Sequence, residues 1–202
     1  MEYKLFCLNK SMHTPSLASS RSLSYIALFA ALIAAFGLIP KIDLPFGVPI
    51  TLQTLGVMLA GCLLGPRRAF QAVALFLLAV ALGLPLLAGG RGGLGVFVAP
   101  SSGFLIGWLF GAPVAGWLMR RMAGARGHAL LAAAFVSALV GGVLVVYLLG
   151  IAGLSLVAHL TLAQAALAVL AFVPGDLIKC GVCALVVQTV MRGMPGWRLD
   201  RD

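Results

Sequence analysis

The sequence predicts an all-α polytopic membrane protein with six transmembrane helices and with both termini in the cytoplasm. Three observations lead to this fold class. Hydrophobic residues make up 62% of the 202 residues and charged residues only 9%, whereas a soluble domain typically has about 25% charged residues. The apolar residues gather in six stretches, and a transmembrane helix needs about 20 of them. Most basic residues then fall on one side of the membrane, in agreement with the positive-inside rule.

The six predicted spans occupy residues 22–191. Residues 1–21 are polar and mixed in composition, so we expect a cytoplasmic N-terminal tail there, and residues 192–202 form the matching C-terminal tail. The spans are Ser22–Ile39, Ile50–Leu64, Ala69–Leu87, Ser102–Met119, Ala129–Gly150 and Leu162–Met191.

The length of the first span and a Pro-Gly pair in the last span affect how these two spans are interpreted. The apolar run of the first span, Leu23–Ile39, is longer than the 7–15 residues of a signal-peptide core, which predicts an uncleaved helix. The second span is short. The sixth contains Pro174-Gly175. Such breaks occur where the freed backbone groups face protein or a cavity rather than lipid.

The basic residues orient this arrangement. With six spans, eleven of the fourteen Lys and Arg residues fall on the side of the termini, and only Lys41 and Arg91 fall on the other. Lys179 lies inside the last span. The eleven are Lys4, Lys10, Arg21, Arg67, Arg68, Arg120, Arg121, Arg126, Arg192, Arg198 and Arg201. The net charge of +9 is therefore explained by topology, and the absence of an aromatic-interleaved basic patch argues against nucleic-acid binding.

Asp176 and Lys179 are the candidate binding residues of the last span. Each charge costs about 2.5–3.5 kcal/mol at the centre of a membrane helix, so such residues usually face a cavity or a partner. Their i,i+3 spacing places them on one helix face. They can form a self-compensating ion pair that only makes the helix insertable. Alternatively, a polar ligand competes for the pair or bridges it, and we favour this interpretation because the Pro-Gly break lies beside it.

Arg91 is the third candidate, in the glycine-rich loop 88–95. Glycine permits close backbone approach or movement, so the loop is either a plain connector or a mobile lid whose arginine faces Lys179. The second arrangement would make a positive pocket for a carboxylate, which a guanidinium binds with two parallel hydrogen bonds. The glycine pattern is not a dinucleotide-binding motif, because no strand precedes it.

Two glutamines and a row of alanines are weaker candidates. Gln53 and Gln71 can bind a ligand, but amides in membrane helices also bond to neighbouring helices, and we favour that role for each. Ala27, Ala31 and Ala35 repeat every fourth residue of the first span. Small residues at this spacing allow helices to approach closely, either within the protein or in a docking face for another membrane protein.

Several other chemistries are not indicated. The sequence contains no GxxxxGK[ST] phosphate-binding loop and no HExxH metal motif. Cys180-x-x-Cys183 stands alone, without a second CxxC or a histidine at ligand spacing, so we predict no metal site. We find no nucleophile–base pair, and we therefore predict no catalytic residues, no cofactor and no enzymatic activity.

Several segments between about residues 22 and 191 form a recognisable combination. They are Leu44-Pro45-Phe46, Pro49–Gly61, Leu84-Pro85, Gly89–Gly95, Pro100–Phe104, and Pro174-Gly175-Asp176 with Lys179. Together they resemble the BioY family. The resemblance implies a biotin-specific substrate-binding (S) component of an energy-coupling factor (ECF) transporter in a prokaryotic inner membrane.

The resemblance also implies roles for individual residues. In the family, an Asp and a Lys of the last helix and an Arg between helices three and four contact biotin, which correspond to Asp176, Lys179 and Arg91. Lys179 and Arg91 would hold the carboxylate, and Asp176 would accept from the ureido ring or orient Lys179. The alanine stripe would contact a transmembrane scaffold protein that works with two ATPases. Two alternatives stay open: an S component for another vitamin-like solute, and a membrane enzyme that uses the Asp176/Lys179 pair.

Overall fold

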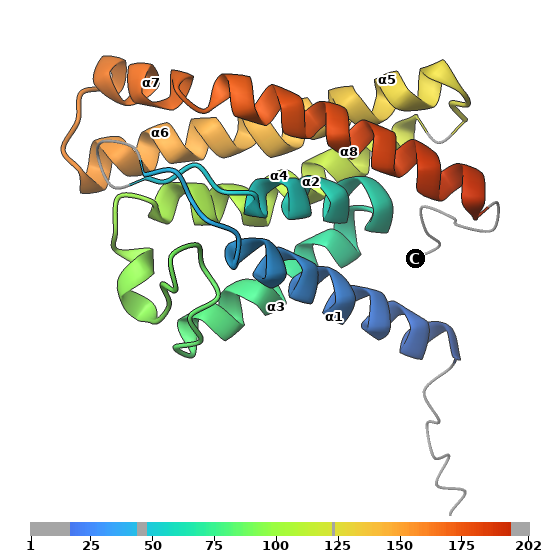
Figure 1. Cartoon of the computed structure of the whole chain (residues 1–202), viewed down its shortest axis with the longest axis horizontal. Helices are drawn as coiled ribbons and strands as arrows, with labels where there is room; N and C mark the ends of the chain where they lie inside the picture. Colours follow the sequence, from blue (N-terminus) through green and yellow to red (C-terminus); the bar gives the residue numbers. More distant parts are fainter. Residues whose placement is uncertain (1–16, 44–47, 123, 195–202) are drawn as a thin grey trace, which may run out of the picture.

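The structure is a computed structural model that describes residues 17–43, 48–122 and 124–194. Within these ranges it is helical, and the β-structure is limited to two isolated bridges, Ile42 with Ile50 and Leu87 with Arg91. The all-α prediction is thus confirmed. The elements, labelled in Figure 1, are α1 (Leu17–Gly37), α2 (Gln53–Leu64), α3 (Pro66–Ala81), the 3₁₀ helix η2 (Leu94–Phe97), α4 (Ser102–Arg121), α5 (His128–Ser137), the π-helix η3 (Ala138–Val145), α6 (Val146–Val157), α7 (Leu162–Leu170) and α8 (Val173–Gly193).

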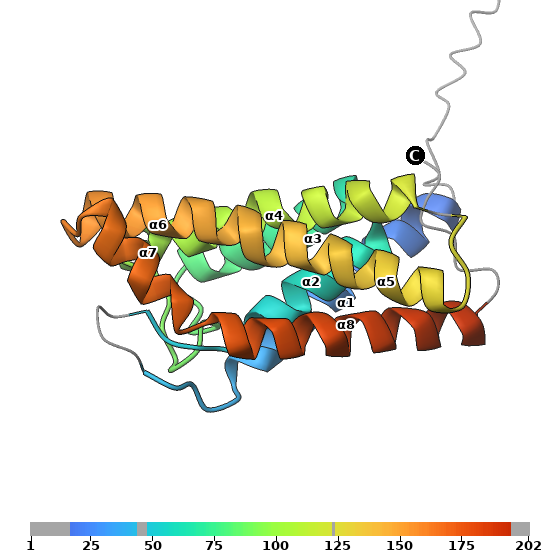
Figure 2. The same ribbon diagram turned by 90° about the horizontal axis from the view of Figure 1, so that it is seen from above.

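The long helices run roughly along one direction (Figures 1 and 2), and α2 packs against α1, α3, α4 and α8. α4 packs against α2, α3, η3 and α6, while α8 packs against α5 and α2. α1 lies at the opposite edge, against α3 and α2. The elements α5, η3 and α6 form one continuous helix of 30 residues, His128–Val157.

Within the part of the chain that the structure describes, four helices are long and apolar enough to cross a membrane by length and composition. They contain the segments Ser20–Gly37, Ser102–Arg121, His128–Val157 and Val173–Gly193. α2 is apolar but has only 12 residues, and α3 has 16. In α2, 11 of the 12 residues are buried, so this helix is surrounded by protein and presents little surface to lipid.

The third predicted span ends earlier than expected. α3 stops at Ala81 instead of Leu87, because the chain turns at Gly83, which has a positive φ of 100°, and then doubles back on itself. The backbone N–H of Gly93 donates to the carbonyl oxygen of Val80 at 2.8 Å. This bond holds the long connection between α3 and α4 against the end of α3.

The last predicted span is interrupted at a different place from the one expected. α7 ends at Leu170 and α8 begins at Val173, so the break comes before Pro174-Gly175. Pro174 lies in the first turn of α8, where a helix tolerates proline because the N–H of that position has no partner within the helix. The proline therefore starts α8.

Other boundaries shift by smaller amounts. α1 begins at Leu17, so residues 17–21 of the predicted N-terminal tail are helical. Residues 1–16 of that tail lie outside the described residues, as do 195–202 of the C-terminal tail and 44–47. The fifth predicted span continues beyond Gly150 to Val157, the end of α6.

Glycines allow α4 to pack directly on the backbone of the long helix beside it. Gly103, Gly107 and Gly111 repeat every fourth residue on one face of α4. A Cβ at Gly103 would lie 2.3 Å from the carbonyl oxygen of Leu149, and one at Gly111 would lie 2.3 Å from that of Gly141. A side chain does not fit at either position, which is the usual reason for small residues between membrane helices.

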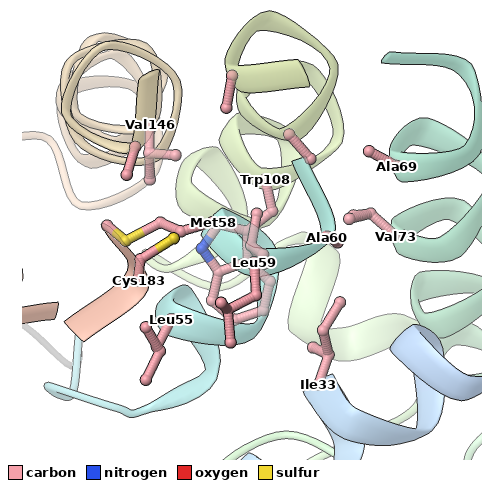
Figure 3. Close-up of a cluster of buried hydrophobic side chains, with 14 of the residues drawn as sticks. Ile33, Leu55, Met58, Leu59, Ala60, Ala69, Val73, Trp108, Val146 and Cys183 are labelled. Carbon is pink, nitrogen blue, oxygen red and sulfur yellow. The ribbon is translucent and has the colours of Figure 1, made fainter. Parts of the chain in front are cut away.

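The core surrounds α2. Figure 3 shows Met58 and Leu59 of α2 among Ile33 of α1, Val73 of α3 and Trp108 of α4, and all of these side chains are buried. Many large apolar residues instead face outward; Leu148 of α6, for example, is 69% exposed. An apolar exterior around an apolar core is expected of a membrane protein.

The two ends of the bundle differ in charge. The start of α1, the α2–α3 turn, the α4–α5 connection and the end of α8 gather at one end, on the right of Figure 1. Arg67 and Arg68 lie in the first turn of α3, Arg120 and Arg121 in the last turn of α4, and Arg192 in the last turn of α8. Segments 38–43, 48–52 and 82–101 lie at the other end.

Candidate functional site

The acid and the base of α8 lie together inside the protein. Asp176 is 3% exposed and Lys179 is 8% exposed. Nζ of Lys179 lies 2.8 Å from Oδ1 of Asp176, so the two side chains form a buried ion pair. Their position in the first two turns of α8 follows from the helix start at Val173.

The pair is bonded to two other parts of the bundle. Lys179 also donates to the carbonyl oxygen of Thr51 at 2.6 Å and to Oγ1 of Thr54 at 2.9 Å, at the beginning of α2. The hydroxyl of Tyr147 in α6 donates to Oδ2 of Asp176 at 2.6 Å. The ion pair therefore connects α8 to α2 and α6, and a buried charge needs such partners because an unpaired one is costly.

The pair lines a cavity with about 540 Å³ of empty space, including its opening to solvent. Small-molecule sites are mostly apolar with a few placed polar groups. The walls follow that pattern. Aromatic rings come from Phe104, Trp108, Tyr147 and Phe172, and the charged lining residues are Arg91, Asp176 and Lys179.

Arg91 reaches this cavity from a tight turn in the α3–α4 connection. The backbone groups of Leu87 and Arg91 bond to each other in both directions, at 3.0 and 3.2 Å. Gly89 and Gly90 between them have φ of 80° and 69°, a conformation that favours glycine. Nη1 of Arg91 donates to Oγ of Ser101 at 3.4 Å, and its Nε has no hydrogen-bond partner among the described residues.

Gln53 borders the cavity but its amide is used within the protein. The side chain is 1% exposed. Its Nε2 donates to the carbonyl oxygens of Ile33 at 3.2 Å and Leu86 at 3.1 Å, and its Oε1 accepts from the N–H of Ala88 at 3.0 Å. Gln53 thus joins α1 and the α3–α4 connection to α2, in agreement with the packing role favoured from the sequence.

Gln71 lies elsewhere. Its side chain is exposed on α3 and does not belong to the cavity lining. We therefore leave it out of the candidate site.

A family model described as the BioY family matches residues 9–196. The chain belongs to the BioY family. Relatives support this membership along nearly the full length. The chain is 50% identical over 180 residues to "Biotin transporter BioY" of Rhizobium etli, covering 88% of this chain and 96% of that protein. It is 49% identical over 190 residues to "Biotin transporter BioY" of Rhodobacter capsulatus, covering 90% of this chain and 98% of that protein.

A solved structure has the same fold as this BioY family member. It is described as the S-component for biotin from an ECF-type ABC transporter. The TM-score is 0.83 at 33% identity, and the match covers 90% of this chain and 96% of that one. The fold of the present chain is therefore that of a known S component.

The alanine stripe lies on the outside of this BioY-family bundle. Ala27, Ala31 and Ala35 are all exposed on α1, while Ala30 of the same helix is buried against the core. The first three alanine side chains therefore face outward from the described part of the bundle.

Sequence reasoning missed the residues that hold the ion pair. Tyr147 is the only tyrosine of the helix His128–Val157. Buried tyrosines usually have a hydrogen-bond partner, so this signal was present in the sequence. Thr51 contributes a backbone carbonyl, for which a side-chain pattern gives no signal. Ser101 and Thr54 are adjacent to helix starts, where such residues are common for structural reasons.

The described residues contain no group of three or more His, Cys, Asp or Glu side chains placed to hold a metal ion. Cys62, Cys180 and Cys183 are buried as free thiols. They act as small apolar residues in the core.

Proposed function

We propose that this protein captures biotin as the S component of an ECF transporter. The observation that carries the proposal is the cavity whose charged lining residues are Arg91, Asp176 and Lys179, in a chain 50% identical to a protein named as a biotin transporter. Biotin has an anionic carboxylate, an apolar chain with a fused ring, and a ureido group with two N–H donors. A mostly apolar cavity with cations and one carboxylate is complementary to these groups.

The hydrogen bonds present in the cavity suggest how biotin is oriented. An ammonium group has three donors, and those of Lys179 are directed at Asp176, Thr51 and Thr54. Among the described residues, Arg91 makes one long bond, to Ser101. We therefore assign the biotin carboxylate to Arg91, and the ureido N–H groups to Asp176 with Lys179 beside it. The sequence-based expectation had placed the carboxylate between Lys179 and Arg91.

The membrane arrangement that fits this role has six crossing segments and cytoplasmic termini. α1, α4, the helix His128–Val157 and α8 supply four crossings. α2 and α3 supply the other two, with α2 shielded from lipid by its neighbours. The arginine-rich end then faces the cytoplasm, and the cavity opens on the outer side of a prokaryotic inner membrane.

Transport energy comes from partner subunits in this proposal. The exposed stripe Ala27, Ala31 and Ala35 docks on the transmembrane scaffold protein of the ECF complex, because small side chains allow close helix approach. Two ATPases attached to that scaffold supply the hydrolysis, and membrane lipid surrounds the remaining apolar surface.

Equilibrium binding of radiolabelled biotin to the purified protein tests the proposal. The wild-type protein should bind biotin tightly, and Asp176→Asn or Lys179→Ala should abolish high-affinity binding while membrane insertion persists. Gln71→Ala is the matched control, since Gln71 lies on the exposed side of α3, and it should bind as the wild type does. Unchanged binding by both site variants would refute the site.

Two further measurements address the alternatives. Competition with biotin, desthiobiotin and thiamin distinguishes biotin from another vitamin-like solute. Mass analysis of the ligand recovered after incubation distinguishes transport from catalysis, since an S component returns the ligand unchanged and an enzyme does not.

A further inference from the structure

Tyr147 connects α6 to the buried carboxylate of the site. It is the second residue of α6, directly after the π-helix, and its half-buried side chain lines the cavity. Its hydroxyl donates to Oδ2 of Asp176 at 2.6 Å, while Oδ1 accepts from Lys179 at 2.8 Å. Each oxygen of the carboxylate is thus held by a different helix.

The ring of Tyr147 is fixed by other aromatic side chains. Its centroid lies 6.4 Å from that of Phe172 at an interplanar angle of 57°, and Phe172 lies 5.8 Å from Phe104. Gly150, one turn after Tyr147, leaves the space that Phe104 fills, because a Cβ there would lie 2.5 Å from a carbon of that ring. The hydroxyl is therefore brought to Asp176 by packing from α4 and from the start of α8.

Although both carboxylate oxygens of Asp176 already accept a hydrogen bond, they can accept further hydrogen bonds from a ligand. A carboxylate has about four lone-pair positions, and the bonds from Lys179 and Tyr147 occupy two. Because these donors approach from α8 and α6, they fix the rotation of the carboxylate, and the remaining lone pairs can be offered to the cavity. A ligand N–H then meets an oriented acceptor, and preorganisation of this kind raises affinity.

We propose that Tyr147 is a positioning residue of the biotin site, which orients Asp176 for the ureido N–H groups through the hydrogen bond to Oδ2. This inference rests on the proposed function, because it assumes that biotin is the ligand. Tyr147 acts through Asp176, and a phenylalanine at this position would keep the ring and lose only the donor.

Tyr147→Phe tests the inference by equilibrium biotin binding. Hydrogen bonds to charged groups are among the stronger ones in proteins, so we expect the Kd to rise by about 10- to 100-fold. Thr189→Val is the control, since it removes a hydroxyl from α8 that bonds only within its own helix, to the carbonyl oxygen of Leu185. Its Kd should equal that of the wild type. An unchanged Kd for Tyr147→Phe would overturn the inference.

Infrared difference spectra of the protein without ligand separate this inference from the proposed function. The Asp176 carboxylate band is identified by its loss in Asp176→Asn, and it should shift in Tyr147→Phe but not in Thr189→Val. An unchanged band would mean that Tyr147 does not bond to Asp176 in the protein, and that result overturns the inference even if biotin binds. Failure of the wild type to bind biotin would instead refute the proposed function, and the band result would stand by itself.

Discussion

Nζ of Lys179, in the second turn of α8, lies 2.6 Å from the backbone carbonyl oxygen of Thr51, just before α2 begins. This bond joins two segments 128 positions apart in the sequence. It explains how a lysine is accommodated inside an apolar bundle, because its ammonium group meets Asp176, a carbonyl oxygen and a hydroxyl together. The same arrangement makes the ion pair a structural connection as well as a wall of the cavity.

We predict that Lys179→Met destabilises the protein more than the double variant Asp176→Asn/Lys179→Met. The single change leaves the Asp176 carboxylate buried without its cation, and such losses cost about 3–5 kcal/mol. The double variant contains no buried charge at this place. Thermal unfolding in detergent should give the lowest midpoint for the single variant, while neither variant should bind biotin. A single variant as stable as the wild type would contradict the structural part of this role.

Arg91→Ala should weaken biotin binding by about 100-fold, because a charge-assisted, bidentate contact to the carboxylate is lost. Biotinamide has no carboxylate, so its affinity should be nearly the same for the variant and the wild type. Titration calorimetry with both ligands measures the difference. An equal loss for both would show that Arg91 does not contact the carboxylate.

Gln53→Met should lower stability rather than remove a ligand contact. The amide of Gln53 bonds to Ile33, Leu86 and Ala88, and methionine preserves its length but not these bonds. Each buried backbone group left unpaired costs about 1–3 kcal/mol. The unfolding midpoint should fall clearly. If stability were unchanged while biotin affinity dropped sharply, Gln53 would be a ligand contact instead.

Gly111→Ala should be strongly destabilising, and Gly175→Ala should not. A Cβ at Gly111 would lie 2.3 Å from the carbonyl oxygen of Gly141, whereas nothing lies within 4 Å of a Cβ at Gly175. Both are helical glycines, so intrinsic helix propensity favours alanine in each, and only the packing differs. Unfolding midpoints of the two variants should move in opposite directions or differ by several degrees. Similar midpoints would contradict the close contact between α4 and its neighbour.

Ala31→Trp should abolish assembly with the ECF scaffold while biotin binding stays intact. Ala31 is exposed on α1 and away from the cavity lining, so a large side chain there obstructs only a molecule that docks on this face. Co-purification with the scaffold and ATPases, and biotin uptake by cells, provide the measurements. Leu148→Trp on exposed α6 is the matched control and should assemble normally. Normal assembly of Ala31→Trp would exclude the stripe as the docking face.

The amino-acid sequence was sufficient for the class of protein and for the charged members of the site. Hydropathy is a property of a continuous stretch of sequence, so the long apolar helices could be predicted without coordinates. The resemblance to the BioY family was also visible in the sequence. The cost of a charge in lipid was enough to single out Asp176 and Lys179. The exact ends of the helices could not be predicted from the sequence, because they depend on tertiary contacts. α3 ends where Gly93 bonds back to Val80, and the break before α8 precedes the proline that seemed to cause it.

Only the tertiary structure decided which groups meet. It places Tyr147 of α6, the carbonyl oxygen of Thr51 and the α8 ion pair around one cavity, it assigns Gln53 to three bonds within the protein, and it exposes Gln71. A linear pattern contains no information about bonds between distant segments or about a backbone carbonyl that accepts from a side chain. The sequence therefore determined which charges enter the membrane, and packing between helices determined what each of them is bonded to.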